Sequence, residues 1–497
     1  MMSQEAAPAQ GPTPVPAPKP EKSSRTRDYL TFNVPAVVGV EDVRQYPRRI
    51  KHIVTSIVAL CGLATPLGSN IFLPVLSPAA KDLGTSPTVM NLSIAFYCLA
   101  VAFTPMWWAT VSESQGKRRT YIITFFFFIV FNVVAAVSVS AGMFIAMRLL
   151  AGGASAPVQA LGAATVADLW ELKERGRAMG IFMLGAMAGN VVGPIVGGAL
   201  GSRWDWRSTQ WFMAIYGGVV WLCVVFFLPE TSKQRTAGEA QSEKSHAKKV
   251  TLASVGKFLI GIPKTMVKPI ELIPLLRFPP ILITVLYTAV NFSAYYYVLI
   301  VIQAVFSSPP YSYSVIIVGV LYLPNAAGNI LAATLGGRWT DRVMVRKARA
   351  AGRLGEGQKP KPQDALGLNI WSAALLYPAA ILVSGWTSDK HVVAVPLIAN
   401  FFFALGNMML QNVTTVTLTE FVPGRAAVGV ALANLVRNVL GAVVVIVAQP
   451  IIDAIGVGWL STIISIICFI SASSIWLLQR NADRWAKEMA EKLPQVS

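Results

Sequence analysis

Residues 185–198 read GAMAGNVVGPIVGG, and the fold follows from this stretch and its surroundings. It lies within an uncharged apolar run, 178–200, which is long enough to cross a hydrocarbon layer of roughly 30 Å. Pro194 removes one backbone donor and bends a helix at this point. Glycines that recur at every fourth position share one face and let another helix approach closely. These glycines are Gly185, Gly189, Gly193 and Gly197.

Eleven more apolar runs of similar length extend along the chain, which has 497 residues, 54% of them hydrophobic and 13% charged. Ordinary soluble domains carry about 25% charged residues and would not bury so many apolar runs. The sequence therefore predicts an all-α membrane protein with twelve transmembrane helices. The other predicted spans are 53–75, 91–111, 120–139, 141–166, 209–228, 280–303, 314–336, 366–386, 391–412, 426–448 and 455–479.

Basic residues predict the orientation of these spans. An even number of spans places both termini on one side, and the tails and loops of that side carry 36 Lys and Arg against four on the other. Such a bias predicts cytoplasmic termini. The net charge of +18 could also indicate nucleic-acid binding, but its distribution favours the topological explanation. We therefore expect the lipid bilayer as a partner and no nucleic acid.

The longest internal connection divides the spans six and six. Its final part, FLIGIPKTMVKPIELIPLLR at 258–277, is expected to lie at the cytoplasmic membrane surface through interfacial packing alone. Residues 1–50 are rich in Pro and Ala, without a signal-peptide core, and are expected to be disordered. The predicted organisation is a cytoplasmic tail over 1–50, a six-helix bundle over 51–228, a central cytoplasmic loop over 229–279, a second six-helix bundle over 280–480 and a cytoplasmic tail over 481–497.

A short repeat supports this division. The loop after the second span reads ATVSESQGKRR at 109–119, and the loop after the eighth reads GRWTDR at 337–342. In both, a small residue precedes an acid by four positions, and basic residues follow. Many secondary transporters are built from such parallel halves.

These residues carry a resemblance to a known family. The loop at 109–119 resembles motif A of the major facilitator superfamily, and MRLLAGG at 147–153 looks like motif B. Residues 185–198 are similar to motif C of the superfamily's antiporters. ATVADLW at 164–170, ERGRAMG at 174–180 and LPET at 228–231 are similar to fungal drug:proton antiporters with twelve spans. The resemblance extends over roughly 50–480.

The resemblance implies two six-helix bundles around a central site that opens alternately to either face. Motif C then implies export, with its helix packed on its counterpart from the other half to seal one side. Motif A departs from the family pattern at Ala109, Glu113 and Ser114, so Arg342 is expected to replace the missing arginine of the inward gate. The residues expected to act in gating are Glu113, Gly116, Lys117, Arg118, Gly185, Gly189, Gly193, Pro194, Gly197, Asp341 and Arg342.

Simpler explanations exist for both gating motifs. The bases of motif A could only enforce topology, and the glycines could form an ordinary packing face. Neither explains Glu113, which stands at the end of the second span. An acid there can meet a helix N-terminus or a base from the other half, in a contact that would break when the cytoplasmic side opens.

Charges inside the spans are distributed unevenly. No Asp or Glu lies within any of the twelve runs, whereas Arg148 and Arg437 do. A charge at this depth usually faces the protein interior or a wet cavity. Arg437 stands close to the bilayer midplane, because it lies roughly 17 Å along its span at 1.5 Å per residue. Positive charge without negative charge makes an anionic or neutral substrate easier to hold than a cation.

Polar side chains align at helical spacing on several spans. Together they predict a wet central cavity suited to a polar or amphiphilic organic molecule, although any single Asn or Gln could only join helices. The residues expected to bind substrate are Arg148, Gln159, Tyr287, Asn291, Tyr295, Asn325, Asn400, Asn407, Asn434 and Arg437.

The preferred function is a secondary active exporter of small organic compounds, drugs or secreted metabolites, which works by proton antiport. Asp168, with Arg148, is the expected proton-coupling group, since the first span carries no acid; pairing of Asp168 with Lys173 or Arg175 is equally open. The runner-up is an exporter of organic acids without strict proton antiport. A transport-like receptor is the alternative from another class.

Other classes find little support. No GxxxxGK[ST] phosphate loop indicates ATP use, and the three His lie outside the mid-membrane without a Ser/His/Asp or metal cluster. We therefore expect no enzyme activity, no cofactor and no metal. Small-molecule substrate and protons are the expected partners of a monomer with both termini cytoplasmic. The plasma membrane is the expected location, and a vacuolar or other internal membrane is the alternative.

Overall fold

The computed structural model describes residue 43 and residues 46–231, 273–350, 368–388, 390, 393–421 and 426–492. This described part consists of helices and the loops that connect them, and contains no strand. Eleven helical stretches of this described part are long and apolar enough to cross a membrane. The last, Gly429–Asn481, has 53 residues and breaks at Gly456, whose φ is 81°. Because one span needs about 20 residues, this stretch holds two of the twelve predicted spans.

The first half contains eight α-helices and one 3₁₀ helix, and the limits of its predicted spans agree with them within a few residues. The fourth span divides where Pro157 begins a new helix, since proline lacks the backbone donor that the helix interior needs. The elements are α1 (Arg48–Asn70), η3 (Leu73–Val75), α2 (Leu76–Asp82), α3 (Pro87–Gln115), α4 (Lys117–Ala136), α5 (Ala141–Ser155), α6 (Pro157–Leu169), α7 (Leu172–Arg203) and α8 (Arg207–Phe227).

The second half has the same kind of helices. Its eighth span is divided into α13, α14 and a short π-helical turn, and α18 continues to Lys492, so the predicted tail from 481 is helical over most of its length. The elements are η4 (Ile273–Arg277), α12 (Pro279–Phe306), α13 (Val315–Val320), α14 (Leu323–Leu331), the π-helix η5 (Ala332–Gly336), α15 (Gly337–Ala350), α16 (Leu368–Thr387), α17 (Ala394–Phe421) and α18 (Ala426–Lys492).

The helix starts follow from local sequence. Ser86 and Ser140 cap α3 and α5, because each hydroxyl accepts a hydrogen bond at 3.3 Å from the backbone N–H three residues later. Pro87 and Pro279 occupy first-turn positions, where their missing donor costs nothing. Most of the amphipathic stretch expected at 258–277 lies outside the described residues.

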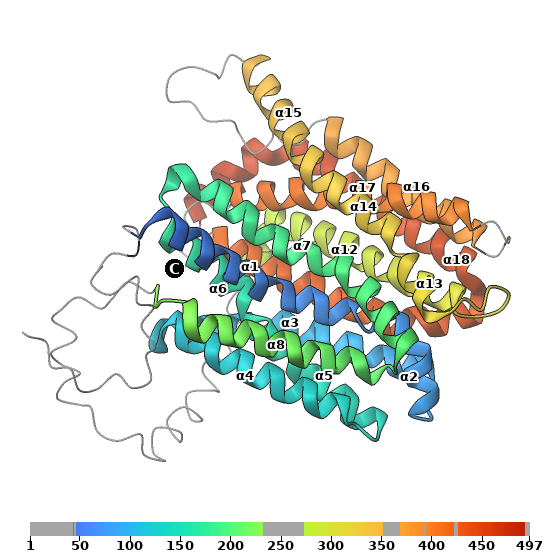
Figure 1. Ribbon diagram of the computed structural model, residues 1–497. Coiled ribbons are helices and arrows are strands. Elements are labelled where there is room, and N and C mark those ends of the chain that lie inside the picture. The colour runs from blue at the N-terminus through green and yellow to red at the C-terminus, as the bar shows by residue number, and fades with distance from the viewer. Residues whose placement is uncertain are drawn as a thin grey trace, which may run out of the picture.

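The two halves lie side by side, with the blue-to-green half against the yellow-to-red half (Figure 1). α3 of the first half packs on α18 of the second, and α7 packs on α13. One buried apolar cluster contains Phe72 and Cys98 from the first half together with Tyr295 and Tyr296 from the second. The core is therefore continuous across the contact between the halves.

The glycine face of α7 packs against α1 of the same half. A Cβ added to Gly189 would lie 2.7 Å from the backbone nitrogen of Leu67 in α1, and one added to Gly185 or Gly197 would overlap the carbonyl groups of Ala59 in α1 and of Ile71 directly after it. The glycine face therefore lies within its own half, while another part of α7 packs on α13 of the other half. The neighbouring Gly198, about 100° further round the helix, makes the contact with the other half.

Candidate functional site

Arg148 is fully buried in the first half without a carboxylate beside it. One guanidinium nitrogen donates to the carbonyl oxygen of Gly68 at 2.7 Å. The group lies over the ring of Tyr97, 4.5 Å from its centroid, and 5.7 Å from that of Phe72. Nε and Nη2 have no hydrogen-bond partner among the described residues. Cation–π contact offsets part of the cost of burying this charge.

Arg437 lies in α18, in the second half, and is only half-buried. Its Nε donates to Oδ1 of Asn434 at 3.1 Å, and its guanidinium lies 4.9 Å from the ring centroid of Phe292. Asn438 also donates to Asn434 Oδ1, at 3.0 Å, which orients the amide toward both donors. No described carboxylate pairs with Arg437.

Tyr296 of α12 joins the two halves between these arginines. Its hydroxyl lies 3.0 Å from Oγ of Ser69 in α1 and accepts from Sγ of Cys98 in α3 at 3.1 Å. Its ring meets that of Phe292 edge-on, with centroids 5.2 Å apart, and Phe292 in turn lies under the Arg437 guanidinium. Tyr296 is therefore a central residue that the sequence interpretation missed, because it chose Tyr287, Asn291 and Tyr295 from this span and left the rest of the run Tyr295–Tyr297 aside.

The amides of Asn291 and Asn407 join α12 to α17. Nδ2 of Asn407 donates to Oδ1 of Asn291 at 2.7 Å and to its backbone oxygen at 2.9 Å, while Nδ2 of Asn291 donates to the backbone oxygen of Asn407 at 3.1 Å. Both side chains are buried. The two amides therefore satisfy each other as a bond between helices, and their role in substrate binding stays a prediction.

The remaining predicted binding residues do not gather at one site. Asn400 accepts from Ser384 at 3.2 Å and joins α17 to α16. Asn325 accepts from Asn329 one turn away, and its own Nδ2 has no described partner. Gln159 is half-buried on α6. Some of the aligned polar residues thus form contacts between helices, and a smaller number lie around Tyr296.

Tyr287 and Tyr295 follow the same division. Tyr287 is 1% exposed in the apolar core of the second half, and its hydroxyl has no described partner. Tyr295 is 9% exposed and stacks on Phe292, with ring centroids 6.3 Å apart. Only Tyr295 therefore belongs with the Phe292–Arg437 group.

A second contact between the halves joins α2 of the first half to the C-terminal end of α12 in the second. Gln303 donates to Oγ of Ser77 at 3.3 Å, and Oγ of Ser77 lies 3.4 Å from Oγ of Ser307. A small pocket of about 40 Å³ opens here between the halves. Asn91 and Gln449 also line it. Hydrogen bonds thus join the halves both here and at Tyr296.

Motif A is bound within the first half. Both carboxylate oxygens of Glu230 accept from backbone N–H groups at the start of α4, from Lys117 at 3.0 Å and Arg118 at 3.1 Å. Gly116 has a φ of 90°, and a Cβ there would lie 2.6 Å from Glu230. The sequence interpretation quoted Glu230 in LPET but assigned it no role; an acid placed to cap a neighbouring helix was the available signal.

The side chain of Lys117 pairs with Asp168, the expected proton-coupling acid, at 2.5 Å. Arg175 instead donates to the carbonyl oxygen of Ala167 at 3.0 Å, so its expected pairing with Asp168 is wrong. Asp168 and Lys117 are 28% and 15% exposed. The acid therefore lies in a partly hydrated ion pair at the end of α6, and Arg148 stands one helix away in α5.

Among the side chains that the structure describes, no ion pair joins motif A to the other half, and the latch stays a prediction. Glu113 is exposed and makes no ion pair with a described residue. Arg342 is exposed on α15, and the side chain of Asp341 lies outside the described residues. The carbonyl oxygen of Pro194, inside α7, faces Gly319 of α13 closely enough that a Cβ on Gly319 would lie 2.8 Å from it.

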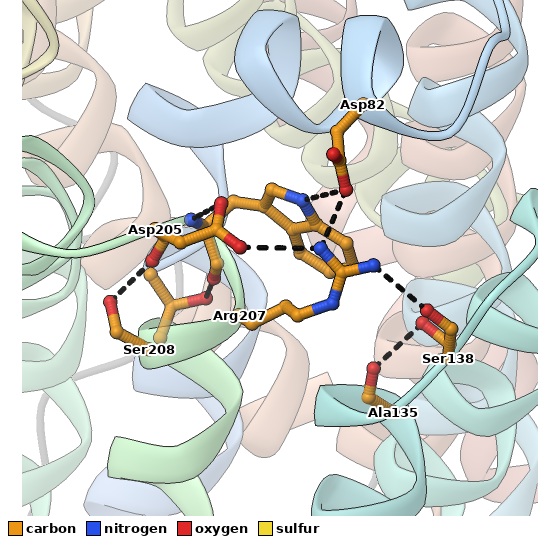
Figure 2. A network of polar contacts seen from close by, with 8 residues as sticks. Asp82, Ala135, Ser138, Asp205, Arg207 and Ser208 are labelled. Atoms are coloured by element: carbon orange, nitrogen blue, oxygen red, sulfur yellow. Dashed lines mark hydrogen bonds and ion pairs between the residues drawn. The ribbon is translucent and has the colours of Figure 1, made fainter.

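A polar network ties three loops together at the opposite end of the first half (Figure 2). Arg207 donates to Asp82 at 2.5 Å, to Asp205 at 3.2 Å and to the carbonyl oxygen of Ser138 at 3.1 Å. The indole of Trp206 also donates to Asp82, at 3.0 Å, and the Arg207 guanidinium lies over its ring. The network fixes the loop ends rather than a binding site, since the described acids and bases satisfy one another.

Comparison with known proteins adds a family to this geometry. The model of the Major Facilitator Superfamily matches residues 58–446. MFS transporter OpS2 of Beauveria bassiana is 46% identical over 346 residues, which cover 68% of this chain and 99% of that protein. MFS antiporter QDR3 of Candida albicans is 28% identical, with 92% of this chain and 81% of that protein covered.

Two more similarities are informative. Citrate exporter 1 of Aspergillus niger is 26% identical, and the alignment covers 97% of this chain and 96% of that protein. The crystal structure of a D-xylose–proton symporter aligns with a TM-score of 0.61 at 17% identity, over 85% of this chain and 97% of that one. At this identity the second similarity concerns the fold alone.

Proposed function

The chain belongs to the major facilitator superfamily, and from this premise we propose that it is a secondary active transporter that exports small organic compounds. The names of its relatives, an antiporter and an exporter among them, support this function. The observation that carries the proposal is the position of Arg437 and Tyr296, a half-buried charge and a shared hydroxyl where the two halves meet. A site there becomes accessible to either side when the halves rock.

The export cycle requires the halves to separate on the outer side. If the termini are cytoplasmic, the contact of Ser77 with Gln303 and Ser307 is the outer one, and it must break to release substrate. The group around Arg437, Phe292 and Tyr296 is then the binding site, since it combines a cation, aromatic faces and a hydroxyl. Aromatic faces and a few placed polar groups suit an amphiphilic organic molecule.

Proton antiport is part of the proposal, and the antiporter among the relatives supports it. Asp168 is the proposed proton-coupling group. Protonating its carboxylate would remove the ion pair with Lys117 and loosen the motif A loop from the end of α6. Arg148, buried without a carboxylate, would keep protons away from the middle of the first half by its charge.

A second function, export of organic acids, has its own support. Arg437 has no described carboxylate partner, so an anion could form charge-assisted hydrogen bonds with it. The similarity to a citrate exporter over nearly the full length of both chains agrees with this substrate class. A proton would then travel with the substrate, or not at all.

The membrane and oligomeric state are also proposals. The chain spans a membrane as a member of its family, and the charge bias of its loops supports cytoplasmic termini. A plasma-membrane location suits an exporter. We propose a monomer, since each chain already contains both halves that enclose the site.

Transport in proteoliposomes tests the proposal. The purified protein is reconstituted, a pH gradient is imposed, and uptake of a cationic dye, a neutral drug and citrate is followed with and without the gradient. Gradient-dependent flux of at least one compound is expected. Absence of gradient-dependent flux for all three would contradict proton antiport.

The substrate class is decided by a matched pair of variants. If anions bind at Arg437, Arg437→Gln should lower citrate uptake by roughly tenfold to a hundredfold, because a hydrogen bond to a charged group contributes about 1.5–3 kcal/mol. Arg437→Lys keeps the charge and should retain a larger share of the flux. Wild-type citrate uptake in Arg437→Gln would reduce this arginine to a structural role.

A further inference from the structure

We propose that Ser69, Cys98 and Tyr296 form a gate between the two halves, and that the Cys98 thiol becomes open to alkylation only when this gate parts. The proposal rests on the proposed function, because a gate has a role only in a protein whose halves alternate between two arrangements. It adds a modification site and assigns a role to three residues outside the predicted set.

The gate is a buried polar cluster in an apolar contact. Tyr296 is 5% exposed, Ser69 is 5% exposed and Cys98 is 1% exposed. The hydroxyl of Tyr296 comes from the second half, whereas Ser69 and Cys98 come from α1 and α3 of the first. Hydrogen bonds in such surroundings are stronger than in water, and an opened cluster must find new partners. Rocking of the halves therefore has to break these bonds.

The neighbours of Tyr296 hold its ring in place. The ring of Phe292 meets it edge-on, with centroids 5.2 Å apart. A Cβ added to Gly441 of α18 would lie 3.3 Å from the Tyr296 ring, so no larger residue fits there without a shift. Because Phe292 also lies under the Arg437 guanidinium, the gate is directly beside the proposed substrate site. Movement of Tyr296 would thus expose that site.

The other cysteines provide internal controls. Cys468 is 0% exposed and lies wholly within the second half, where Tyr377 is its neighbour. Cys61 is 0% exposed and packs inside the first half. Neither touches the contact between the halves. A reagent that reaches Cys98 but not Cys468 therefore reports separation of the halves rather than general loosening.

The chemistry is a simple addition. The deprotonated sulfur of Cys98 attacks one alkene carbon of N-ethylmaleimide, a carbon–sulfur bond forms as the carbon–carbon π bond breaks, and the adjacent carbon takes a proton from water. A thiol in an apolar site hardly ionises, so the reaction needs water to reach Cys98. The rate of alkylation consequently follows the fraction of molecules whose gate is open.

The experiment uses the full chain in detergent, with Cys98 as its single cysteine after Cys61→Ala, Cys223→Ala and Cys468→Ala. Alkylation by N-ethylmaleimide is followed by intact mass. Adding Tyr296→Phe removes the hydroxyl but keeps the ring, and should raise the Cys98 rate roughly fivefold to thirtyfold, as the loss of one or two buried hydrogen bonds implies. Ser69→Ala should raise it less, because the bond from Cys98 to Tyr296 remains.

The matched control keeps Cys468 as the single cysteine. Its rate should stay within about twofold when Tyr296→Phe is added, since its neighbours do not change. An unchanged Cys98 rate in both Tyr296→Phe and Ser69→Ala would overturn the gate. An equal rise at Cys98 and Cys468 would also overturn it, because it would indicate general loosening. The labelling needs no transport, so failure of the flux assay alone would contradict the proposed function and not the gate.

Discussion

Alanine substitution at two adjacent glycines of α7 should have two different effects, one on the stability of the protein and one on the arrangement of its halves. A Cβ on Gly197 would overlap the carbonyl group of Ile71, which directly follows α1 within the first half. A Cβ on Gly198 would lie 3.0 Å from Cα of Gly319 in α13, across the contact between the halves. Gly197→Ala should therefore destabilise the first half in every state, whereas Gly198→Ala should disfavour only the arrangement in which α7 and α13 touch.

The magnitudes follow from the size of the overlaps. Carbon atoms in normal contact lie about 3.5–4.0 Å apart, and overpacking costs roughly 1–3 kcal/mol. In Gly197→Ala the new methyl group meets rigid backbone, so the loss in free energy of unfolding should lie at the upper end of this range. The higher helix propensity of alanine offsets up to about 1 kcal/mol of it. Gly198→Ala overlaps less, and about 1–2 kcal/mol against the closed arrangement raises the population of the open one roughly fivefold to thirtyfold.

Two measurements separate the effects. The first is the unfolding midpoint in detergent, with Gly218→Ala as control, because a Cβ on Gly218 of α8 would meet open space. The second is labelling of a cysteine at Ser307→Cys by a membrane-impermeant maleimide, in a background without other cysteines. Ser307 lies beside Ser77 in the contact that we propose to be the outer one, so its labelling should rise when the halves part.

We expect a lower midpoint for Gly197→Ala, a midpoint near the parent's for Gly198→Ala and Gly218→Ala, and faster Ser307→Cys labelling for Gly198→Ala alone. If Gly198→Ala lowers the midpoint as much as Gly197→Ala and leaves labelling within twofold of the parent, the assignment of the two faces is refuted.

Three further predictions concern other contacts. Ser77→Cys with Ser307→Cys should form a disulfide under oxidation, since the two Oγ atoms lie 3.4 Å apart, and transport should stop until a reductant is added; inhibition that a reductant does not reverse would contradict this. Asn407→Leu should lower the unfolding midpoint in detergent through a loss of about 2–4 kcal/mol, because Oδ1 and the backbone oxygen of Asn291 lose the Nδ2 donor of Asn407; an unchanged midpoint would refute the role of this pair in joining α12 to α17. Glu230→Ala should lower the free energy of unfolding by roughly 1 kcal/mol in the same assay, because α4 loses its N-terminal cap. Glu230→Gln should lower it less, since the amide oxygen can still accept one of the two hydrogen bonds.

Much of the fold could be predicted because each span is specified locally. An apolar run must form a helix to satisfy its backbone in hydrocarbon, and this holds whatever its neighbours are. The predicted spans agree with the helices, and α18 joins the last two across Gly456. The family resemblance on motifs A, B and C was confirmed by the match over 58–446.

The site could be predicted only in part. Arg148 and Arg437 stood out because charges are rare at this depth, and both lie in the interior without a carboxylate among the described residues. The amides could not be sorted in the same way. Asn291 and Asn407 align on their helices as a ligand-binding pair would, yet they bond to each other across α12 and α17.

The sequence by itself determined the membrane class, the number and limits of the spans and the division into two halves, because the exclusion of charge from hydrocarbon acts on each run separately. Only the tertiary structure decided which neighbour each helix face meets. Residues 185–198 illustrate the difference: their period predicts a close-packed face, but it names no partner, and α1 lies against it while Gly198 meets α13. The same holds for Tyr296, whose partners Ser69 and Cys98 lie on helices of the other half.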